Sequence, residues 1–226
     1  MRVSAVPAAL RAAGVDTRHE YQHLFSIYVP IAIGVFAAIV LAMGFALAKY
    51  TRRSPEQAAR WHEHNPLEGG YAALLTLVVV FLLYLTFTAE HRVDTVANQQ
   101  QPAVTINVTA AKWEWTFAYP AYGITHRSGT VGSEPLVVPT GEPVRVNLSS
   151  LDVIHAFWIP YIRDKHDAIP GSTQVITLSF PRAGTFQGEC AEFCGLRHSD
   201  MLFNVRAVSP AQFSGWARSG GKAPLP

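Results

Sequence analysis

Two long stretches without a charged side chain constrain this sequence more than any other feature. The first runs from Leu24 to Ala48 and the second from Gly69 to Ala89, which is 25 and 21 residues. About 20 apolar residues are enough for a helix to cross the hydrocarbon core of a membrane. Charged residues make up 15% of the 226 residues and hydrophobic residues 49%, a balance too apolar for an ordinary soluble domain. We therefore predict a transmembrane helical hairpin over residues 24–89 rather than two core helices of a soluble protein.

The loop between the two stretches, residues 49–68, carries the charge that orients the hairpin. Its basic residues are Lys49, Arg52, Arg53 and Arg60. The twelve residues after the second stretch offer only Arg92. The positive-inside rule then places the loop in the cytoplasm. The N-terminal tail, residues 1–23, and everything after residue 89 are expected on the outer side; a short processed leader within residues 1–15 stays an open alternative.

The hydrophobic pattern changes to a period of two after residue 102. Val104, Ile106 and Val108 alternate with polar residues, as is typical of a half-buried strand. The predicted strands cover residues 104–108, 144–148, 174–180 and 201–208. Short strands at this spacing, without helical patterns between them, indicate an all-β sandwich.

The predicted fold class is thus mixed, with a two-helix transmembrane hairpin followed by an all-β domain. We place the β-domain at residues 102–210. A short amphipathic segment over residues 210–218 is expected to end the ordered chain, and residues 211–226 are assigned to a C-terminal tail.

A short segment near the C-terminus concentrates side chains that bind soft metal ions. These are Cys190, Glu192, Cys194, His198 and Met201, and a further candidate, His155, lies upstream. Thiolate, imidazole and thioether together favour copper over hard cations. Two thiolates can each bridge two copper ions, so we predict a two-copper unit with one imidazole on each metal, from His155 and His198. Met201 and the main-chain carbonyl of Glu192 are then the weak axial ligands.

Simpler interpretations of these residues stay open. Cys190 and Cys194, the two cysteines of the chain, could pair as a disulfide in an oxidising compartment. Two cysteines and two histidines could also bind structural zinc. Zinc does not require a methionine at a fixed position, however, and Met201 is one of only three. The sequence has no C-x-x-C-H motif, so no covalently attached haem is expected in this chain, and no long Lys/Arg run, so nucleic acid is not an expected partner.

The chain resembles subunit II of the haem–copper cytochrome c oxidases. The motif C-x-E-x-C-x3-H-x2-M stands here from Cys190 to Met201, and the run from Asp152 to His155 is similar to the family's upstream ligand segment. Residues 165–171 resemble its K-x-D-A-I-P-G stretch and residues 112–119 its aromatic cluster. The resemblance covers roughly residues 20–210 and implies a cupredoxin-like domain with the binuclear copper centre called CuA.

The resemblance also implies partners and roles. The domain would accept electrons from cytochrome c and pass them to haem in subunit I, with other oxidase subunits and membrane lipid around it. Trp113 matches the residue through which the electron enters, the alternative being core packing. Glu192 matches a carboxylate that binds magnesium at the subunit I border, and Glu68 matches one at the mouth of a proton-uptake channel, the alternative being an ordinary interfacial carboxylate. The implied location is the inner membrane of a bacterial cell, with the copper domain on the periplasmic side.

Some residues depart from the family's pattern. Ala118 stands where a glutamate is common, and Phe117 replaces a frequent tyrosine. Ser172 replaces the usual arginine. Acidic and basic side chains nearly balance over the β-domain, so steering of a strongly basic donor should be weak and a less basic or membrane-tethered cytochrome is an alternative donor. The leading alternative function is the copper-bearing small subunit of a nitric oxide reductase; a membrane-anchored copper carrier is a further one.

Overall fold

The computed structural model describes residues 17–51, 64–130 and 133–225, with only the backbone for residues 97–99. The chain forms two compact units, one from Glu20 to His91 and one built mainly from Arg92 onward. Most of the predicted N-terminal tail and of the predicted cytoplasmic loop, with Arg52, Arg53 and Arg60, lies outside the described ranges.

The first unit is a pair of long helices, α2 (Thr17–Tyr50) and α3 (Asn65–Gln99). Both are long and apolar enough to cross a membrane, and none of the α2 side chains is buried within the protein. The helices touch where the Tyr28 hydroxyl donates to the Leu82 carbonyl at 2.7 Å and lies 2.5 Å from the Thr86 hydroxyl. Each helix extends past the uncharged stretch that predicted it, because its polar ends continue the same backbone hydrogen bonding.

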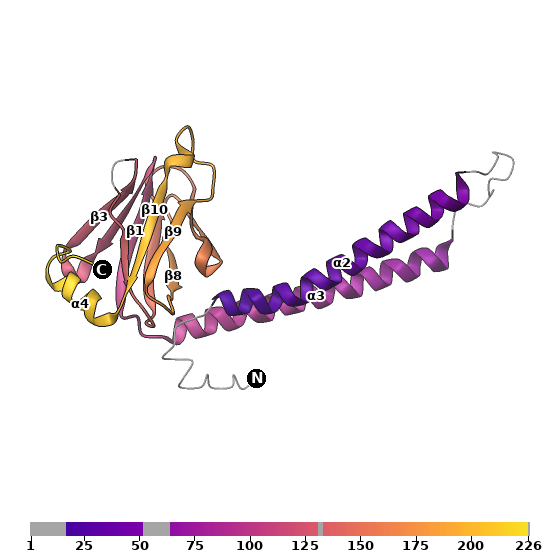
Figure 1. Cartoon of the computed structure of the whole chain (residues 1–226), viewed down its shortest axis with the longest axis horizontal. Helices are drawn as coiled ribbons and strands as arrows, with labels where there is room; N and C mark the ends of the chain where they lie inside the picture. The colour runs from indigo at the N-terminus through magenta and orange to yellow at the C-terminus, as the bar shows by residue number, and fades with distance from the viewer. Residues whose placement is uncertain (1–16, 52–63, 131–132, 226) are drawn as a thin grey trace. The chain divides into compact units, whose positions relative to one another are not determined.

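The described residues of the second unit form ten strands and a short helix, and Figure 1 shows how these elements are arranged. The strands are β1 (Val104–Ala111), β2 (Glu114–Tyr119), β3 (Ile124–Gly129), β4 (Leu136–Pro139), β5 (Val144–Ser150), β6 (His155–Ile159), β7 (Asp164–Ala168), β8 (Gln174–Leu178), β9 (Gly184–Cys190) and β10 (Leu202–Val208). Three 3-10 turns, η2 (Pro120–Tyr122), η3 (Pro160–Ile162) and η4 (His198–Asp200), and the helix α4 (Pro210–Arg218) complete it.

The strands form two five-stranded sheets with the core between them. One sheet has the order β3-β2-β1-β5-β8 and the other β4-β10-β9-β6-β7. In the first sheet β1 and β5 run parallel, with Ile106 opposite Val146. Alternate residues of both strands point inward and are buried, as the period of two predicted. The predicted helical hairpin followed by a β-sandwich is therefore confirmed.

Helix α4 closes the sandwich at the end where β10 finishes. Ser209 and Gln212 form a capping box that starts the helix. Phe213 and Trp216 are buried, and the Trp216 ring lies edge-on to Tyr119 at 5.1 Å between centroids. The packed domain thus extends beyond residue 210, because these two aromatic side chains complete its core.

Candidate metal centre

The six predicted copper ligands come together at one end of the sandwich, opposite α4. His155 opens β6, Cys190 closes β9, and Met201 directly precedes β10. The intervening loop carries Glu192 and Cys194, and η4 begins with His198. Because β6, β9 and β10 belong to one sheet, their ends bring residues 35 or more positions apart to a single site.

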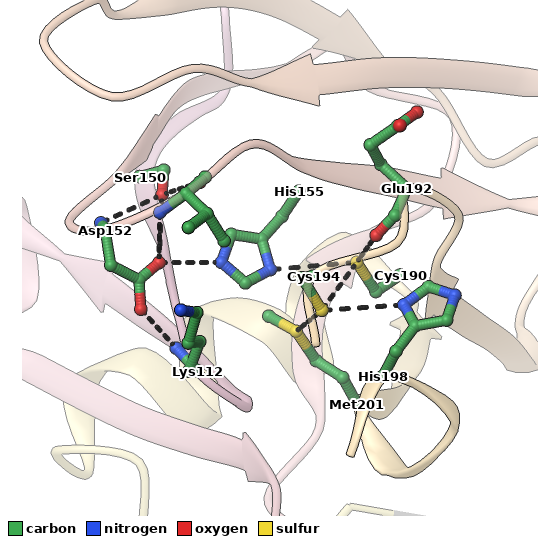
Figure 2. Close-up of polar contacts among 10 residues, drawn as sticks. Lys112, Ser150, Asp152, His155, Cys190, Glu192, Cys194, His198 and Met201 are labelled. Atoms are coloured by element: carbon green, nitrogen blue, oxygen red, sulfur yellow. Dashed lines mark hydrogen bonds and ion pairs between the residues drawn. The ribbon is translucent and has the colours of Figure 1, made fainter. Parts of the chain in front are cut away.

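The two sulfurs form the centre of this cluster (Figure 2). The Sγ atoms of Cys190 and Cys194 are 3.9 Å apart, and both cysteines are buried and free. Nδ1 of His155 lies 3.7 Å from the Cys190 sulfur, and Nδ1 of His198 lies 3.5 Å from the Cys194 sulfur. Each thiol therefore has one imidazole nitrogen beside it, in a pairwise arrangement.

Two further donor atoms lie at the edges of the sulfur pair. The Met201 thioether sulfur is 3.9 Å from the Cys194 sulfur, and Met201 is fully buried. The main-chain carbonyl oxygen of Glu192 is 3.3 Å from the Cys190 sulfur. Both donors are weak metal ligands, and each stands beside a different sulfur.

Backbone hydrogen bonds fix the ends of the ligand loop. The Cys190 amide donates to the Met201 carbonyl at 3.1 Å, which joins the two ends of the loop. The Ala191 amide donates to the carbonyl of Ala156, beside His155, at 3.0 Å. Within the loop the His198 amide donates to the Gly195 carbonyl at 3.1 Å. The loop that carries Glu192, Cys194 and His198 is therefore tied to the sheet at its ends.

The electrostatics of the sulfur pair are asymmetric. Burial alone would raise the pKa of the Cys190 thiol, but its hydrogen bonds with His155, with the backbone of Glu192 and Ala156 and with Cys194 together outweigh this and lower the pKa to about 7. Burial lowers the pKa of His155, and its contacts with Cys190 and Asp152 reverse the effect and raise it. Burial and the neighbouring negative charge of Cys190 raise the pKa of Cys194 to about 12. One thiolate thus opposes the formation of the second.

This donor set fits a metal centre. Two buried thiolates side by side are unfavourable unless positive charge lies between them, and a metal cation supplies that charge. Donor atoms of His155, Cys190 and Cys194 lie within 4.8 Å of one another, close enough to share an ion. Among the described residues no other group of three such side chains meets this criterion. The disulfide alternative is absent from the structure, since both cysteines are free.

Trp113 lies beside the ligand loop and, partly buried, also packs against the edge of the core. It stands in the turn between β1 and β2 and is half-buried. A Cβ atom placed on Gly195 would lie 3.4 Å from the Trp113 ring carbon Cζ2 and 3.5 Å from its Nε1. Gly195 has a φ of +120°, a conformation that favours glycine. The indole therefore packs on the backbone next to Cys194, with its Nε1 buried and without a hydrogen-bond partner.

The two predicted carboxylate sites have different surroundings. The Glu192 side chain is about half exposed, with an oxygen 4.0 Å from Lys165 Nζ. Glu68 belongs to the helical unit, where its carboxylate accepts a hydrogen bond from the His64 amide at 3.2 Å in the first turn of α3. That contact satisfies a backbone donor at the start of the helix.

Asp152 is a site residue to which sequence reasoning gave no role. Its carboxylate oxygen Oδ1 lies 2.8 Å from Nε2 of His155. This leaves Nδ1 of the ring facing the sulfurs, as a metal ligand requires. The burial of Asp152 would raise its pKa, but hydrogen bonds from His155, Val153 and Lys112 outweigh this and lower it. An aspartate three residues before a candidate ligand histidine was the signal available in the sequence.

Comparison with known proteins gives consistent results. The profile described as cytochrome C oxidase subunit II, periplasmic domain, matches residues 129–208. A probable cytochrome c oxidase subunit 2 of Streptomyces coelicolor is 30% identical over 221 residues, covering 81% of this chain and 69% of that protein. The one from Streptomyces avermitilis is 31% identical over the same shares.

A solved structure resembles the β-domain. The crystal structure of the periplasmic domain of subunit II of cytochrome oxidase (CoxB) of Bradyrhizobium japonicum is 32% identical, with a TM-score of 0.51. The match covers 54% of this chain and 96% of that one. The β-sandwich described above is therefore the fold of that domain.

Proposed function

This chain belongs to the cytochrome c oxidase subunit II family, and from that premise we propose that its β-domain holds two copper ions and, with them, conducts electrons from a cytochrome c to the haem of subunit I. The oxygen-reducing site would then lie in another chain. The observation that carries the proposal is the buried pair of free thiols, each with an imidazole Nδ1 beside it.

The arrangement supports a specific assignment of ligands. Cys190 and Cys194 would bridge the metals, and the imidazoles of His155 and His198 would each bind one of them. Met201 and the carbonyl of Glu192 would complete the set as weak ligands, because each lies beside a different sulfur. When bound, the copper pair supplies one-electron redox chemistry. His155 and Cys190 lie on strands, and the loop that carries the other donors is hydrogen-bonded to the same sheet, which limits how far the donors can move and favours fast electron transfer.

Trp113 is the residue we propose to carry electrons to this site. Its indole is half-buried, so part of the ring is accessible to a donor protein, and the other part packs on Gly195 next to Cys194. Trp113→Phe should slow reduction by the donor and leave the copper spectrum unchanged. If the rate of reduction by the donor were unchanged, Trp113 would have only a packing role.

The charges around Trp113 bear on the chemistry of the donor. Glu114, which follows Trp113 in the chain, lies 3.7 Å from Arg127, and Asp200, at the end of η4 in the ligand loop, lies 3.0 Å from Arg197. Surface carboxylates paired in this way attract a basic protein weakly. We therefore expect a donor with a modest positive charge, soluble or membrane-tethered.

The magnesium role of Glu192 remains a proposal for the assembled oxidase. Its side chain is half exposed and free to meet a partner chain, but Lys165 lies 4.0 Å away and Asp167 lies 3.2 Å from that lysine. A cation bound by Glu192 would have to compete with Lys165. Glu192→Gln should therefore lower magnesium or manganese retention in the purified complex without altering the copper content.

Proton uptake through Glu68 is likewise a proposal. The hydrogen bond from the His64 amide accounts for Glu68 as a helix-capping residue. Glu68→Gln keeps an acceptor for this amide but removes the charge. Slower proton uptake with an unchanged helix content would support the channel role. Unchanged proton uptake would show that Glu68 acts only as a helix-capping residue.

The two apolar helices support a membrane-anchored subunit. We propose the inner membrane of a bacterium, with the β-domain on the periplasmic side. Protease treatment of right-side-out vesicles should remove the β-domain and spare the helices; protection of the domain would place it on the opposite side.

The function is tested by metal analysis and electron paramagnetic resonance of the purified oxidase. Two copper ions per copy of this chain, with one unpaired electron shared between both nuclei, are expected. One copper, or zinc, would exclude the binuclear site. Turnover with oxygen rather than with nitric oxide would distinguish an oxidase from a nitric oxide reductase. Retention of copper in the presence of a mild chelator would exclude a copper carrier.

A further inference from the structure

Asp152 contacts two parts of the chain that the electron path needs, and it does so with separate oxygen atoms. Oδ1 lies 2.8 Å from Nε2 of His155, whereas Oδ2 accepts a hydrogen bond from the backbone amide of Lys112 at 2.8 Å (Figure 2). Lys112 directly precedes Trp113 and lies 40 positions from Asp152 in the sequence. One carboxylate thus joins a candidate copper ligand to the turn that carries the tryptophan.

We propose that Asp152 is a positioning residue that couples the copper-binding geometry of His155 to the placement of Trp113; this rests on the proposed function of both residues. The carboxylate keeps the His155 ring turned so that Nδ1 faces the sulfurs. The same carboxylate fixes the start of the Trp113 turn.

The Asp152 carboxylate is itself rigidly held. The Val153 amide donates to Oδ1 at 2.7 Å, and the Asp152 amide donates to the Ser150 hydroxyl at 3.3 Å. That hydroxyl donates in turn to the Val153 carbonyl at 2.5 Å. The Asp152 side chain is 31% exposed, so its position depends on these bonds rather than on burial. A local turn would need only the contacts to residues 150 and 153; the bond to Lys112 serves another purpose.

The contacts form a closed ring of residues that passes through the candidate metal centre. From His155 the ring passes through Asp152 to the Lys112 amide and on to Trp113, whose indole packs on Gly195 beside Cys194. The Cys194 and Cys190 sulfurs then lead back to His155. A shift at the Asp152 carboxylate therefore reaches the copper ligand and the tryptophan together.

Asp152→Asn is the informative substitution because it preserves size but presents one acceptor and one donor. The amide cannot accept from both His155 and Lys112 through separate oxygens. Asp164→Asn is the matched control, since Asp164 also contacts a histidine, with Oδ2 2.9 Å from Nε2 of His166, and has no part in the ring.

The first measurement does not depend on copper. Hydrogen–deuterium exchange of the copper-free full chain should speed up at the Lys112 amide in Asp152→Asn and stay unchanged there in Asp164→Asn. Exchange at Lys112 that is the same in all three proteins would overturn the proposal, whatever metal the chain binds. The exchange measurement therefore tests the role of Asp152 alone. The proposed function is tested separately, by the copper content of the wild-type oxidase.

The second measurement is a double-mutant cycle with Trp113→Phe in the purified oxidase. Loss of an outer contact to a metal ligand commonly costs about tenfold or more in affinity or activity. We expect Asp152→Asn to slow reduction by the donor about tenfold when Trp113 is present and clearly less in the Trp113→Phe background, because coupled residues are not additive. Equal fold-changes in both backgrounds would show that Asp152 does not position Trp113.

Discussion

The indole N–H of Trp115 donates to the backbone carbonyl of Met201 at 3.4 Å, and both residues are fully buried. The Trp115 ring also lies edge-on to His155, at 6.2 Å between ring centroids. One tryptophan of β2 therefore contacts both limbs of the metal centre. Since the bond to Met201 uses its carbonyl, the position of that residue's backbone does not depend on its side chain.

Met201→Leu should consequently preserve the fold but change the redox properties of the metal centre. Volume-conserving swaps in a core usually cost less than about 1.5 kcal/mol. Removal of the thioether deprives the oxidised centre of a weak ligand, so the reduction potential should rise and electron transfer should slow. Redox titration of the near-infrared band measures the change. Met43→Leu, the same swap in α2, is the control; identical spectra and potentials in both variants would show that Met201 is not a ligand.

Cys194→Ser should abolish the proposed two-copper centre. The Cys194 sulfur lies 3.5 Å from His198 Nδ1 and 3.9 Å from the Met201 sulfur, so its loss would remove the bridge and isolate those two donors. Metal analysis should give at most one copper per chain, and the shared electron signal should disappear. A variant that still binds two coppers with a shared electron would refute the bridging role.

Copper loading should depend on pH in a defined direction. The pKa of Cys190 is lowered to about 7 and that of Cys194 is raised to about 12, so near pH 8 the copper-free pair holds one proton and below pH 7 it holds two. Metal binding must release these protons. Affinity should therefore rise with pH, about tenfold per unit near pH 8 and about a hundredfold per unit below pH 7.

Calorimetry in buffers of different ionisation enthalpy counts the protons released on copper binding. The protonated form of His155, whose pKa is raised, adds a further proton at low pH. An affinity that does not change between pH 6 and pH 8 would contradict the two-thiolate site.

Gly188→Ala should destabilise the domain. A Cβ atom there would lie 2.2 Å from a ring carbon of Phe203, which is buried in the core and stacks on Phe157 at 4.7 Å between centroids. Overpacking of this kind costs about 1–3 kcal/mol. Gly215→Ala in α4 meets open space and should be neutral or stabilising by up to about 1 kcal/mol. Thermal unfolding of the two variants tests the contrast, and equal midpoints would contradict it.

The strands that were predicted are ones with apolar residues in their pattern, although β2, in which Trp115, Phe117 and Tyr119 alternate with less buried residues, was not among them. The patterns near Val104, Val144, Gln174 and Met201 correspond to β1, β5, β8 and β10. In contrast, β3 carries His126, Arg127 and Ser128, and β7 is almost entirely polar. Both are edge strands, where charged residues are usual and only one neighbour supplies hydrogen bonds. Such segments become strands through pairing, which the local sequence does not contain.

The metal centre was more accessible to sequence reasoning than its surroundings. Five candidate ligands occur within twelve residues, so chemistry alone singled them out. The contacts of Asp152 and Trp115 join residues 40 and 86 positions apart, and no local pattern encodes them. The roles of Glu192 in magnesium binding and of Glu68 in proton uptake stay predictions, because each requires groups from another chain.

The closing helix α4 has a practical consequence for producing the β-domain in isolation. A fragment cut after β10 would retain every candidate copper ligand yet lose Phe213 and Trp216, leaving Tyr119 and His126 open to water at the far end of the sandwich. Such a fragment is expected to aggregate on expression. The fragment should instead end beyond Arg218, so that the purified domain keeps the buried aromatic side chains of α4.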